Sequence, residues 1–313
     1  MTLQQQIRSA RLRTVVVLVL FVLLVIVVAA AVQFAFGGSW GWLMLALAIG
    51  YGIFGYVAAG SIVAAASGAR KIDKAEHPEL WNSVENAAIA AGLAKTPDVY
   101  IVDDPAPNAF AAGRTPATSY VAATTGILTL LDKRELEGVM AHEMAHVRNR
   151  DVRLMTLAAV LVGSISMLAD MLMWSMFLGG GRNSNDNGGG NALGALVAIA
   201  AMILAPLGAA LLQMSLSRRR EYLADATAAE LTGDPEGLAR ALWKLGADPT
   251  PLRKVNRATA HLWVESPLRD NQGLRSGLSG LFDTHPPLEE RIKRLEQMGG
   301  FTLPPVPRGG AEG

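Results

Sequence analysis

Residues 141–146 read Ala141-His142-Glu143-Met144-Ala145-His146 and contain the pattern H-E-x-x-H. Residues four apart lie on the same face of an α-helix, so His142 and His146 can point at one ion. Two neutral imidazoles suit zinc, and zinc lowers the pKa of a bound water to about 7. Glu143 can then take the proton from that water and pass it to a leaving group. The pattern therefore predicts metal-assisted hydrolysis of an amide.

The sequence on either side of this pattern favours a helix. Asp132-Lys133-Arg134-Glu135 predicts an N-cap followed three residues later by a capping-box glutamate. The alternative is a chance match on an ordinary surface helix, which is expected in about one chain per hundred or fewer. An apolar stripe at helical spacing also supports the helix, and it consists of Leu136, Val139, Met140 and Val147.

The composition narrows the classes of protein. The chain has 313 residues, of which 51% are hydrophobic, and its mean hydropathy of +0.29 is high for a soluble protein. The net charge of +1 gives no basis for binding nucleic acid. Cysteine is absent, so any zinc has to be held by histidine and carboxylate side chains.

Two long apolar runs open the chain. No charged residue occurs between Arg13 and Arg70, which leaves room for two spans of about 20 residues, at 14–36 and 40–66. A cleaved signal peptide is the alternative for the first run, but a second run follows it directly. Basic residues flank the pair, and the positive-inside rule then places both ends in the cytoplasm. These basic residues are Arg8, Arg11, Arg13, Arg70, Lys71 and Lys74.

Residues 72–152 have the pattern of a soluble α/β unit. We expect a helix over 78–93, strands over 98–103, 108–111 and 119–125, and then the motif helix. A strand before such a helix can offer its edge to an extended peptide, which makes Asn108-Ala109-Phe110-Ala111 a candidate for substrate binding. An ordinary buried strand explains these four residues equally well.

A second pair of apolar runs spans 154–178 and 192–216. The glycine-rich polar segment 179–190 separates them, and Arg218-Arg219-Arg220 follows them, which favours a second membrane hairpin returning to the cytoplasmic side. A buried helical hairpin in a large core is the alternative. Asp170 is expensive within a span, so it would face a helix partner or a water-filled cleft.

The third metal ligand has to come from elsewhere, because catalytic zinc usually keeps three protein ligands and one open position. Glu221 and Asp225 are four apart in a segment of helical pattern that ends at Gly233. Glu221 can bind the metal while Asp225 accepts a hydrogen bond from a ligand imidazole. The alternative is a carboxylate pair on a solvated helix face, balanced by the three preceding arginines.

With these elements in place, the sequence resembles the HtpX-type membrane zinc metalloproteases, the family that includes the CAAX prenyl protease. The resemblance starts from His142-Glu143-Met144-Ala145-His146 followed by Glu221-x-x-x-Asp225, and it covers nearly the whole chain. Asn108-Ala109-Phe110-Ala111 matches the edge-strand motif of that family. The stretch 284–291, Thr-His-Pro-Pro-Leu-Glu-Glu-Arg, matches its C-terminal His-Pro…Arg element.

The resemblance implies a membrane endopeptidase with one zinc ion on His142, His146 and Glu221 and with Glu143 as general base. It also implies that residues 108–111 bind the substrate backbone and that His285 and Arg291 lie near the site. His285 could stabilise the negative charge on the carbonyl oxygen, or it could cap the helix after Pro286 and Pro287. Arg291 would orient a carboxylate or the C-terminal helix. Such bacterial proteins act in quality control of misfolded or damaged membrane proteins.

The predicted fold is a multi-spanning α-helical membrane protein with a zincin-like α+β catalytic domain and two transmembrane hairpins. The active site and both termini are expected on the cytoplasmic side of a bacterial inner membrane, with protein or peptide substrates, the lipid bilayer as a partner and no nucleic acid. The predicted divisions are 1–70 (first hairpin), 71–153 (catalytic unit), 154–216 (second hairpin), 217–298 (third-ligand helix and the rest of the catalytic domain) and 299–313 (tail).

Three other functions remain open at this point. A processing protease of narrow specificity would use the same chemistry on fewer substrates. A membrane protein with a structural zinc site would not be catalytic, although such sites are usually rich in cysteine, which this chain lacks. A metal transporter could use His142, His146 and Asp170.

Overall fold

The computed structural model describes residues 40–160, 218–253, 262–264 and 286–307, together with Leu12, Val16 and Val19. The predictions made for the first apolar run, for most of the second hairpin with Asp170, and for His285 lie outside these residues. Within the described ranges, no helix combines the length and the apolar character needed to cross a membrane.

A four-stranded sheet in the order β1-β2-β4-β3 forms the frame of the catalytic unit. β2 runs parallel to β4, whereas β1 pairs antiparallel with β2 and β3 pairs antiparallel with β4, so β3 is an edge strand. Every residue of β4 is buried, as expected for a strand that is covered on both faces. The strands are β1 (Ala69–Lys71), β2 (Asp98–Val102), β3 (Ala109–Ala112) and β4 (Tyr120–Thr124).

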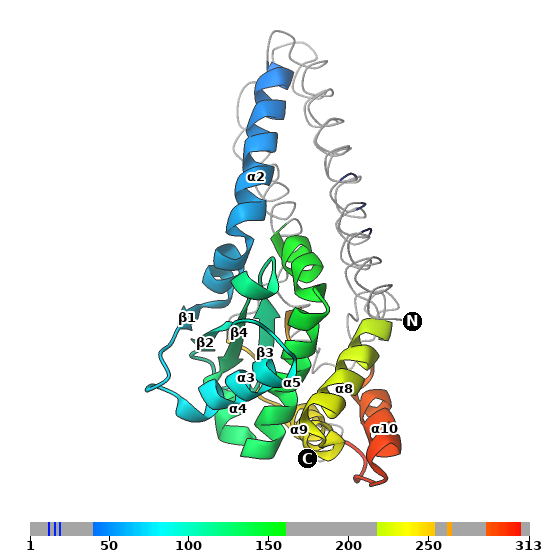
Figure 1. Cartoon of the computed structure of the whole chain (residues 1–313). Helices are drawn as coiled ribbons and strands as arrows, with labels where there is room; N and C mark the ends of the chain where they lie inside the picture. Colours follow the sequence, from blue (N-terminus) through cyan, green and yellow to red (C-terminus); the bar gives the residue numbers. More distant parts are fainter. Residues whose placement is uncertain are drawn as a thin grey trace, which may run out of the picture.

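The helices described are α2 (Trp40–Ser67), α3 (Pro78–Ala90), α4 (Thr125–Leu130), α5 (Lys133–Arg148), α8 (Arg218–Thr232), α9 (Pro235–Ala247) and α10 (Leu288–Gly299). α2 extends away from the sheet and its helices, and α5 lies centrally among α3, α8 and α9 (Figure 1). Residues 151–160 form a further helical run directly after α5. The predicted division between residues 153 and 154 therefore falls inside a helical run.

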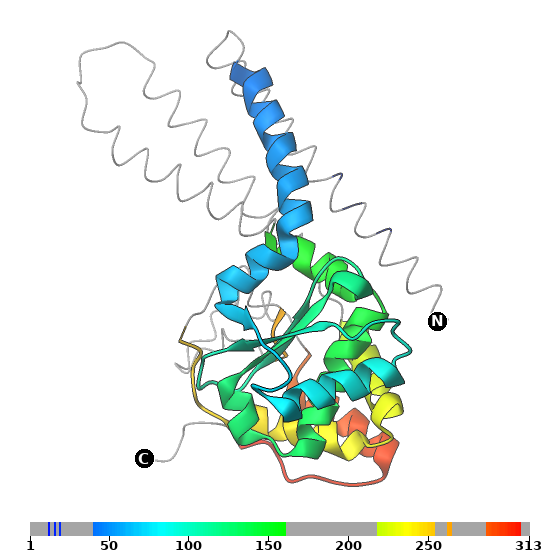
Figure 2. The same ribbon diagram turned by 60° about the vertical axis from the view of Figure 1, so that its left-hand side comes forward.

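The two faces of the sheet pack against different partners. Val99, Ile101 and Val121 belong to the larger core, which α3, α5, α8, α9 and α10 complete on one face (Figure 2). Phe110 and Tyr120 point into a smaller core on the other face. Because side chains alternate between the faces of a strand, the local sequences of β2 and β4 specify both layers.

The start of α5 confirms the predicted capping box. The side chain of Asp132 accepts a hydrogen bond from the backbone N–H of Glu135 at 3.0 Å, and Glu135 Oε2 accepts one from the backbone N–H of Asp132 at 2.8 Å. Lys244 of α9 adds an ion pair to Glu135 at 2.6 Å. At Gly138, an added Cβ would lie 2.7 Å from the backbone nitrogen of Leu238, so glycine allows α5 to approach α9 closely.

Several local predictions differ from the structure, among them the helix predicted over 78–93, which ends at Ala90, and the strand predicted over 98–103, which ends at Val102. The strand predicted over 119–125 ends at Thr124, because the Thr124 hydroxyl accepts a hydrogen bond from the backbone N–H of Ile127 and caps the short helix α4. The sequence analysis expected no helix between this strand and the motif helix. The strand predicted over 108–111 begins one residue later, at Ala109.

Candidate active site

Helix α5 places the H-E-x-x-H residues inside the protein. His142, Glu143 and His146 are all at least 97% buried, because helices pack on the sides of α5 and β3 packs on the same helix. The two imidazole rings lie 4.8 Å apart and nearly perpendicular to each other. Two histidines one helical turn apart therefore share a dry interior, where polar groups require partners.

Helix α8 brings the third predicted ligand to the two histidines. Glu221 Oε2 lies 3.7 Å from His142 Nε2, and Glu221 Oε1 lies 3.5 Å from His146 Nε2. One ligand atom from each residue lies within 4.8 Å of the others. Ligand atoms about 2.0–2.1 Å from a tetrahedral metal are roughly 3.4 Å apart. The three side chains thus form a donor set of suitable size and chemistry for a divalent metal.

Asp225 contacts the imidazole of His142, and Arg291 binds Asp225. We term His142, Asp225 and Arg291 the Asp225 triad. His142 Nδ1 lies 3.0 Å from Asp225 Oδ1, which leaves Nε2 directed at Glu221. Arg291 of α10 binds both oxygens of Asp225, with Nη2 at 2.7 Å from Oδ1 and Nε at 2.9 Å from Oδ2. Asp225 thus lies where the sequence analysis expected a partner for a ligand imidazole.

The protonation of the Asp225 triad suits a neutral ligand imidazole. Burial lowers the pKa of His142. Burial acts to raise the pKa of Asp225, but the charge of Arg291 and the hydrogen bonds from His142 and Arg291 together outweigh burial and hold this pKa at about 2. An ionised Asp225 accepts the Nδ1 proton of His142, and the lone pair of Nε2 then remains available for a metal.

A second set of the same composition supports His146, and we term His146, Asp151 and Arg220 the Asp151 triad. His146 Nδ1 lies 3.5 Å from Asp151 Oδ2, and Arg220 Nη1 lies 3.6 Å from Asp151 Oδ1. Neither Asp151 nor a role for Arg220 in the site was predicted from the sequence. The available signal was a carboxylate five residues after the second histidine, just beyond Arg150, whose φ of 63° marks the break after α5.

His146 carries a proton in the metal-free chain. Burial acts to lower its pKa, but Glu221 and Asp151 together outweigh burial and raise the pKa to about 9. The surrounding carboxylates therefore favour a positive charge at this position. Because metal ligands have to be deprotonated, a bound divalent cation would replace this proton.

Glu143 follows His142 on α5 and is buried close to His146 and Glu221. Burial, assisted by the nearby charge of Glu221, raises the pKa of Glu143 to about 7, although His146 acts against this shift. Its carboxylate accepts a hydrogen bond from the backbone N–H of Ala111 in β3. A carboxylate with a pKa near neutrality can both accept and return a proton.

The free edge of β3 runs beside these groups. The backbone N–H of Thr124 donates to the carbonyl of Asn108, and the backbone N–H of Asn108 donates to the hydroxyl of Thr124, so the start of β3 is bound to the end of β4. The pairing alternates along β3, so the polar backbone groups of Ala109 and Ala111 point away from β4. The carbonyl of Ala109 already accepts a hydrogen bond from the backbone N–H of Val264 at 2.9 Å. The predicted substrate-binding edge thus lies next to Glu143, and part of it is occupied by the chain itself.

The segment 262–264 is held at this edge by two further contacts. The ring of Trp263 packs against Phe110 of β3, with centroids 4.7 Å apart. Arg291 Nη1 lies 3.4 Å from the carbonyl oxygen of Val264, so the arginine of the Asp225 triad also contacts the edge segment. Trp263 was not predicted from the sequence to belong to the site. His285 lies outside the described residues.

A buried His-His-Glu donor set with an adjacent glutamate of raised pKa defines a metal-dependent hydrolase. The family model for peptidase family M48 matches residues 74–299, which include every residue of both triads. The chain belongs to peptidase family M48. It is a metalloprotease that acts on peptide or protein substrates and uses a divalent metal.

Relatives of similar length support this assignment. The chain is 46% identical over 250 residues to the protease HtpX homolog of Tropheryma whipplei (strain Twist), which covers 80% of this chain and 82% of that protein. It is 48% identical over 246 residues to the protease HtpX homolog of Dictyoglomus thermophilum, covering 79% and 78%. The resemblance to HtpX-type proteases is therefore confirmed. A crystal structure of S. mikatae Ste24p aligns with a TM-score of 0.47 at 19% identity, covering 90% of this chain and 62% of that one.

Proposed function

We propose that the chain is a zinc-dependent membrane endopeptidase in which His142, His146 and Glu221 hold one zinc ion. The observation that carries this proposal is the convergence of both Nε2 atoms on the carboxylate of Glu221, inside the protein. Two imidazoles and one carboxylate are a common ligand set for catalytic zinc, and they leave a fourth position open. When bound, zinc would lower the pKa of water at that position to about 7 and polarise the substrate carbonyl.

Glu143 is the general base and then the general acid in this proposal. It takes the proton of the attacking water and delivers it to the amide nitrogen that leaves. Its pKa of about 7 in the metal-free chain supports the dual role, because the carboxylate can be ionised before the attack and protonated after it. Asp225 and Asp151 hold the two imidazoles in the orientation that directs Nε2 to the metal.

The substrate is an extended peptide that pairs with the free edge of β3. Main-chain pairing aligns a peptide without demanding a particular sequence, which suits a protease that meets many substrates. Within residues 108–111, Ala109 and Ala111 have backbone groups that face this edge. The substrate has to accommodate or displace Val264 at Ala109, and at Ala111 it meets an N–H that already donates to Glu143. His285 is proposed as the donor that stabilises the negative charge on the carbonyl oxygen.

The catalytic unit works at the cytoplasmic face of a bacterial inner membrane. Residues 1–70 and 154–216 form two membrane hairpins, residues 71–153 and 217–298 together form the catalytic domain, and residues 299–313 are a tail. Charge-free apolar runs flanked by basic clusters support this arrangement and place both termini in the cytoplasm. Misfolded or damaged membrane proteins are the proposed substrates, and a site held close to the bilayer would meet them as they are extracted.

The first experiment compares zinc content and casein cleavage in detergent for the wild type, Glu143→Gln and His146→Ala. We expect zinc in the first two proteins, none in His146→Ala, and cleavage only by the wild type. Loss of the proton-transfer group should lower the rate by about 10²–10⁴-fold without removing a ligand. Retained cleavage by a clean Glu143→Gln preparation would contradict the mechanism, and zinc absent from the wild type after loading would contradict the metal site.

A further inference from the structure

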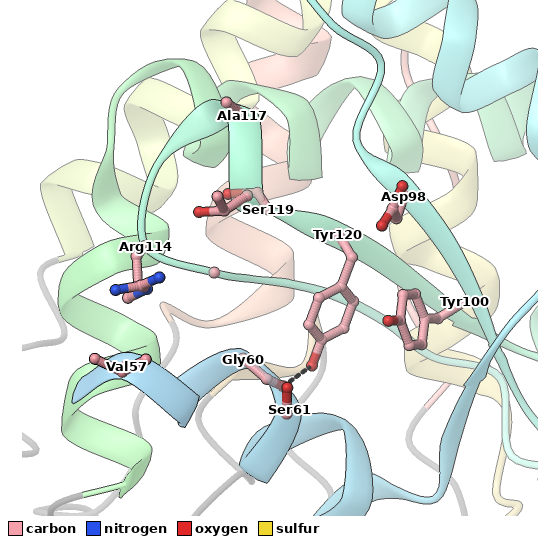
Figure 3. Close-up of a pocket in the computed structure, with 11 residues that line it drawn as sticks. Val57, Gly60, Ser61, Asp98, Tyr100, Arg114, Ala117, Ser119 and Tyr120 are labelled. Atoms are coloured by element: carbon pink, nitrogen blue, oxygen red, sulfur yellow. Dashed lines mark hydrogen bonds between the residues drawn. The ribbon is translucent and has the colours of Figure 1, made fainter. Parts of the chain in front are cut away.

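A polar pocket of about 340 Å³ lies at the junction between α2 and the sheet. It shares no lining residue with the candidate active site. Its walls come from α2, β2 and the connection from β3 to β4, and they include Gly60, Ser61, Arg114, Ser119 and Tyr120. The phenol of Tyr120 donates a hydrogen bond to the carbonyl of Gly60 at 3.0 Å and closes one side of the pocket (Figure 3).

Arg114, which lines the pocket, and Arg153, which does not, each lie over the ring of Tyr56. The Cζ atoms of Arg114 and Arg153 each lie 5.5 Å from the centroid of the Tyr56 ring. Arg153 Nη2 also donates to the Tyr56 hydroxyl at 2.6 Å. Within the described part of the chain, neither guanidinium has a carboxylate partner, and Arg153 Nε is buried without an acceptor. Arginine donors near a low-dielectric surface favour an anion that can accept several hydrogen bonds.

The one acidic residue of the lining does not neutralise these arginines. Asp98 pairs with Lys71 at 2.9 Å and lies 3.9 Å from Lys95. Figure 3 shows Asp98 at the opposite end of the pocket from Arg114. The positive charge near Tyr56 is therefore uncompensated among the described residues.

An exposed apolar face of α2 lies next to the end of the pocket that contains Arg114. Val57 lines the pocket and is 57% exposed, and Ile53, four residues earlier on the same face of α2, is 63% exposed. Phe54 beside them is 61% exposed. A hollow with uncompensated arginines next to an exposed apolar face matches an amphiphile with a phosphate head and acyl chains.

We propose that this pocket binds the phosphate of an anionic phospholipid headgroup, with Arg114 of its lining as a ligand, Arg153 at the neighbouring Tyr56 as a second positive charge, and the exposed face of α2 along the acyl chains. The site rests on the proposed placement of α2 in a membrane. Because Tyr56 belongs to α2 and Arg153 to the helical run 151–160, a bound headgroup would join the membrane helix to the segment that follows the motif helix.

Binding of phosphatidylglycerol to the full-length chain in detergent tests the site, with native mass spectrometry as the readout. The variant is Arg114→Gln with Arg153→Gln. The control is Arg70→Gln with Arg134→Gln, which removes the same charge from two exposed arginines that are paired with Glu76 and Asp234. We expect the Kd to rise about tenfold or more in the variant and to stay within about twofold in the control. Equal changes in the two proteins, or none in the variant, would overturn the site.

Three further measurements test where the bound phosphate comes from, whether net charge is recognised, and whether the chain lies in a membrane as the proposal assumes. Displacement of the lipid by millimolar inorganic phosphate would show a site for free anions and overturn the lipid assignment. If phosphatidylcholine binds as tightly as phosphatidylglycerol, the pocket does not recognise the net negative charge of the headgroup, and the proposal is overturned. Flotation with phosphatidylcholine vesicles tests membrane placement independently: a chain that does not float contradicts the proposed function, whereas one that floats with unaltered lipid binding in the variant contradicts only the pocket.

Discussion

The Asp225 triad and the Asp151 triad have the same composition but different geometry. Each consists of an imidazole from the proposed metal site, a buried aspartate and an arginine. In the Asp225 triad the carboxylate is 3.0 Å from the imidazole and receives two arginine hydrogen bonds of 2.7 and 2.9 Å. In the Asp151 triad the corresponding separations are 3.5 and 3.6 Å. The first triad is a hydrogen-bonded unit and the second is a looser ion-pair arrangement.

The difference follows from which helices supply the parts. The residues of the Asp225 triad come from α5, α8 and α10, so its hydrogen bonds hold three helices together in addition to orienting a ligand. Asp151 lies just beyond α5, and Arg220 is the immediate neighbour of Glu221. We therefore expect the Asp225 triad to determine stability and metal affinity together, and the Asp151 triad to affect mainly the metal.

The largest expected effect is on the free energy of unfolding, which substitution of the two arginines should lower by different amounts. Arg291→Met keeps the volume but leaves Asp225 as a buried carboxylate without its counter-ion, which should lower the free energy of unfolding by about 3–5 kcal/mol. Arg220→Met should cost about 1 kcal/mol, because Arg220 lies farther from its aspartate and keeps some contact with solvent. Chemical denaturation in the presence of a chelator removes the contribution of the metal. Equal losses would mean that the distances do not determine the strength of the two triads.

The next largest expected effect is on metal affinity, which substitution of the two aspartates should weaken to different extents. Removing a partner of a ligand imidazole typically weakens metal binding by about 10–100-fold. We expect Asp225→Asn near the upper end of this range and Asp151→Asn near the lower end, measured by competition with a chromogenic chelator. Glu79→Gln on the exposed side of α3 is the matched control for loss of a carboxylate. A weaker effect at Asp225 than at Asp151 would reverse the comparison.

Sequence reasoning could identify one partner of the metal ligands and not the other, for a physical reason. Asp225 is one helical turn from Glu221, and this spacing places both on one face without knowledge of the fold. Asp151 follows a break in the helix at Arg150, and no periodicity carries across such a break. Arg291 lies 66 residues beyond Asp225, and only the family resemblance connected it with the site.

The fold was predictable where a local signal decided it. The capping box at Asp132 located the start of α5, and segments of strand character located β2, β3 and β4 to within one or two positions, whereas β1 was not predicted. Helix α4 escaped prediction because it depends on the Thr124 cap. The contact between Val264 and Ala109 joins segments 155 residues apart, and nothing in either segment indicates the other.

A smaller effect should follow from loosening the segment that Arg291 holds at the edge of β3. Trp263→Ala removes the packing against Phe110, so Val264 should leave the carbonyl of Ala109 free for substrate. One recovered backbone hydrogen bond predicts a KM about two- to tenfold lower with little change in kcat. Trp243→Ala, whose indole contacts Pro304, is the control. A raised KM would instead make segment 262–264 a wall that the substrate needs.

The smallest expected effect concerns Asp234, a carboxylate that is less buried than those of the two triads. Asp234 caps α9 and pairs with Arg134 at 2.9 Å, and the hydrogen bond from Arg134 is the main reason that its pKa lies below the usual 3.8. A carboxyl group with a lowered native pKa stabilises the fold above its unfolded pKa, and this contribution disappears as the pH falls through the native value. Asp234→Ala should therefore cost about 1 kcal/mol at pH 7 and progressively less below pH 3.8. Unfolding of the two proteins at pH 7 and in acid measures this difference. A cost that persists after Asp234 is protonated would show that the side chain stabilises the fold through packing and not through its charge. Asp234 could then no longer be compared with the buried carboxylates of the two triads.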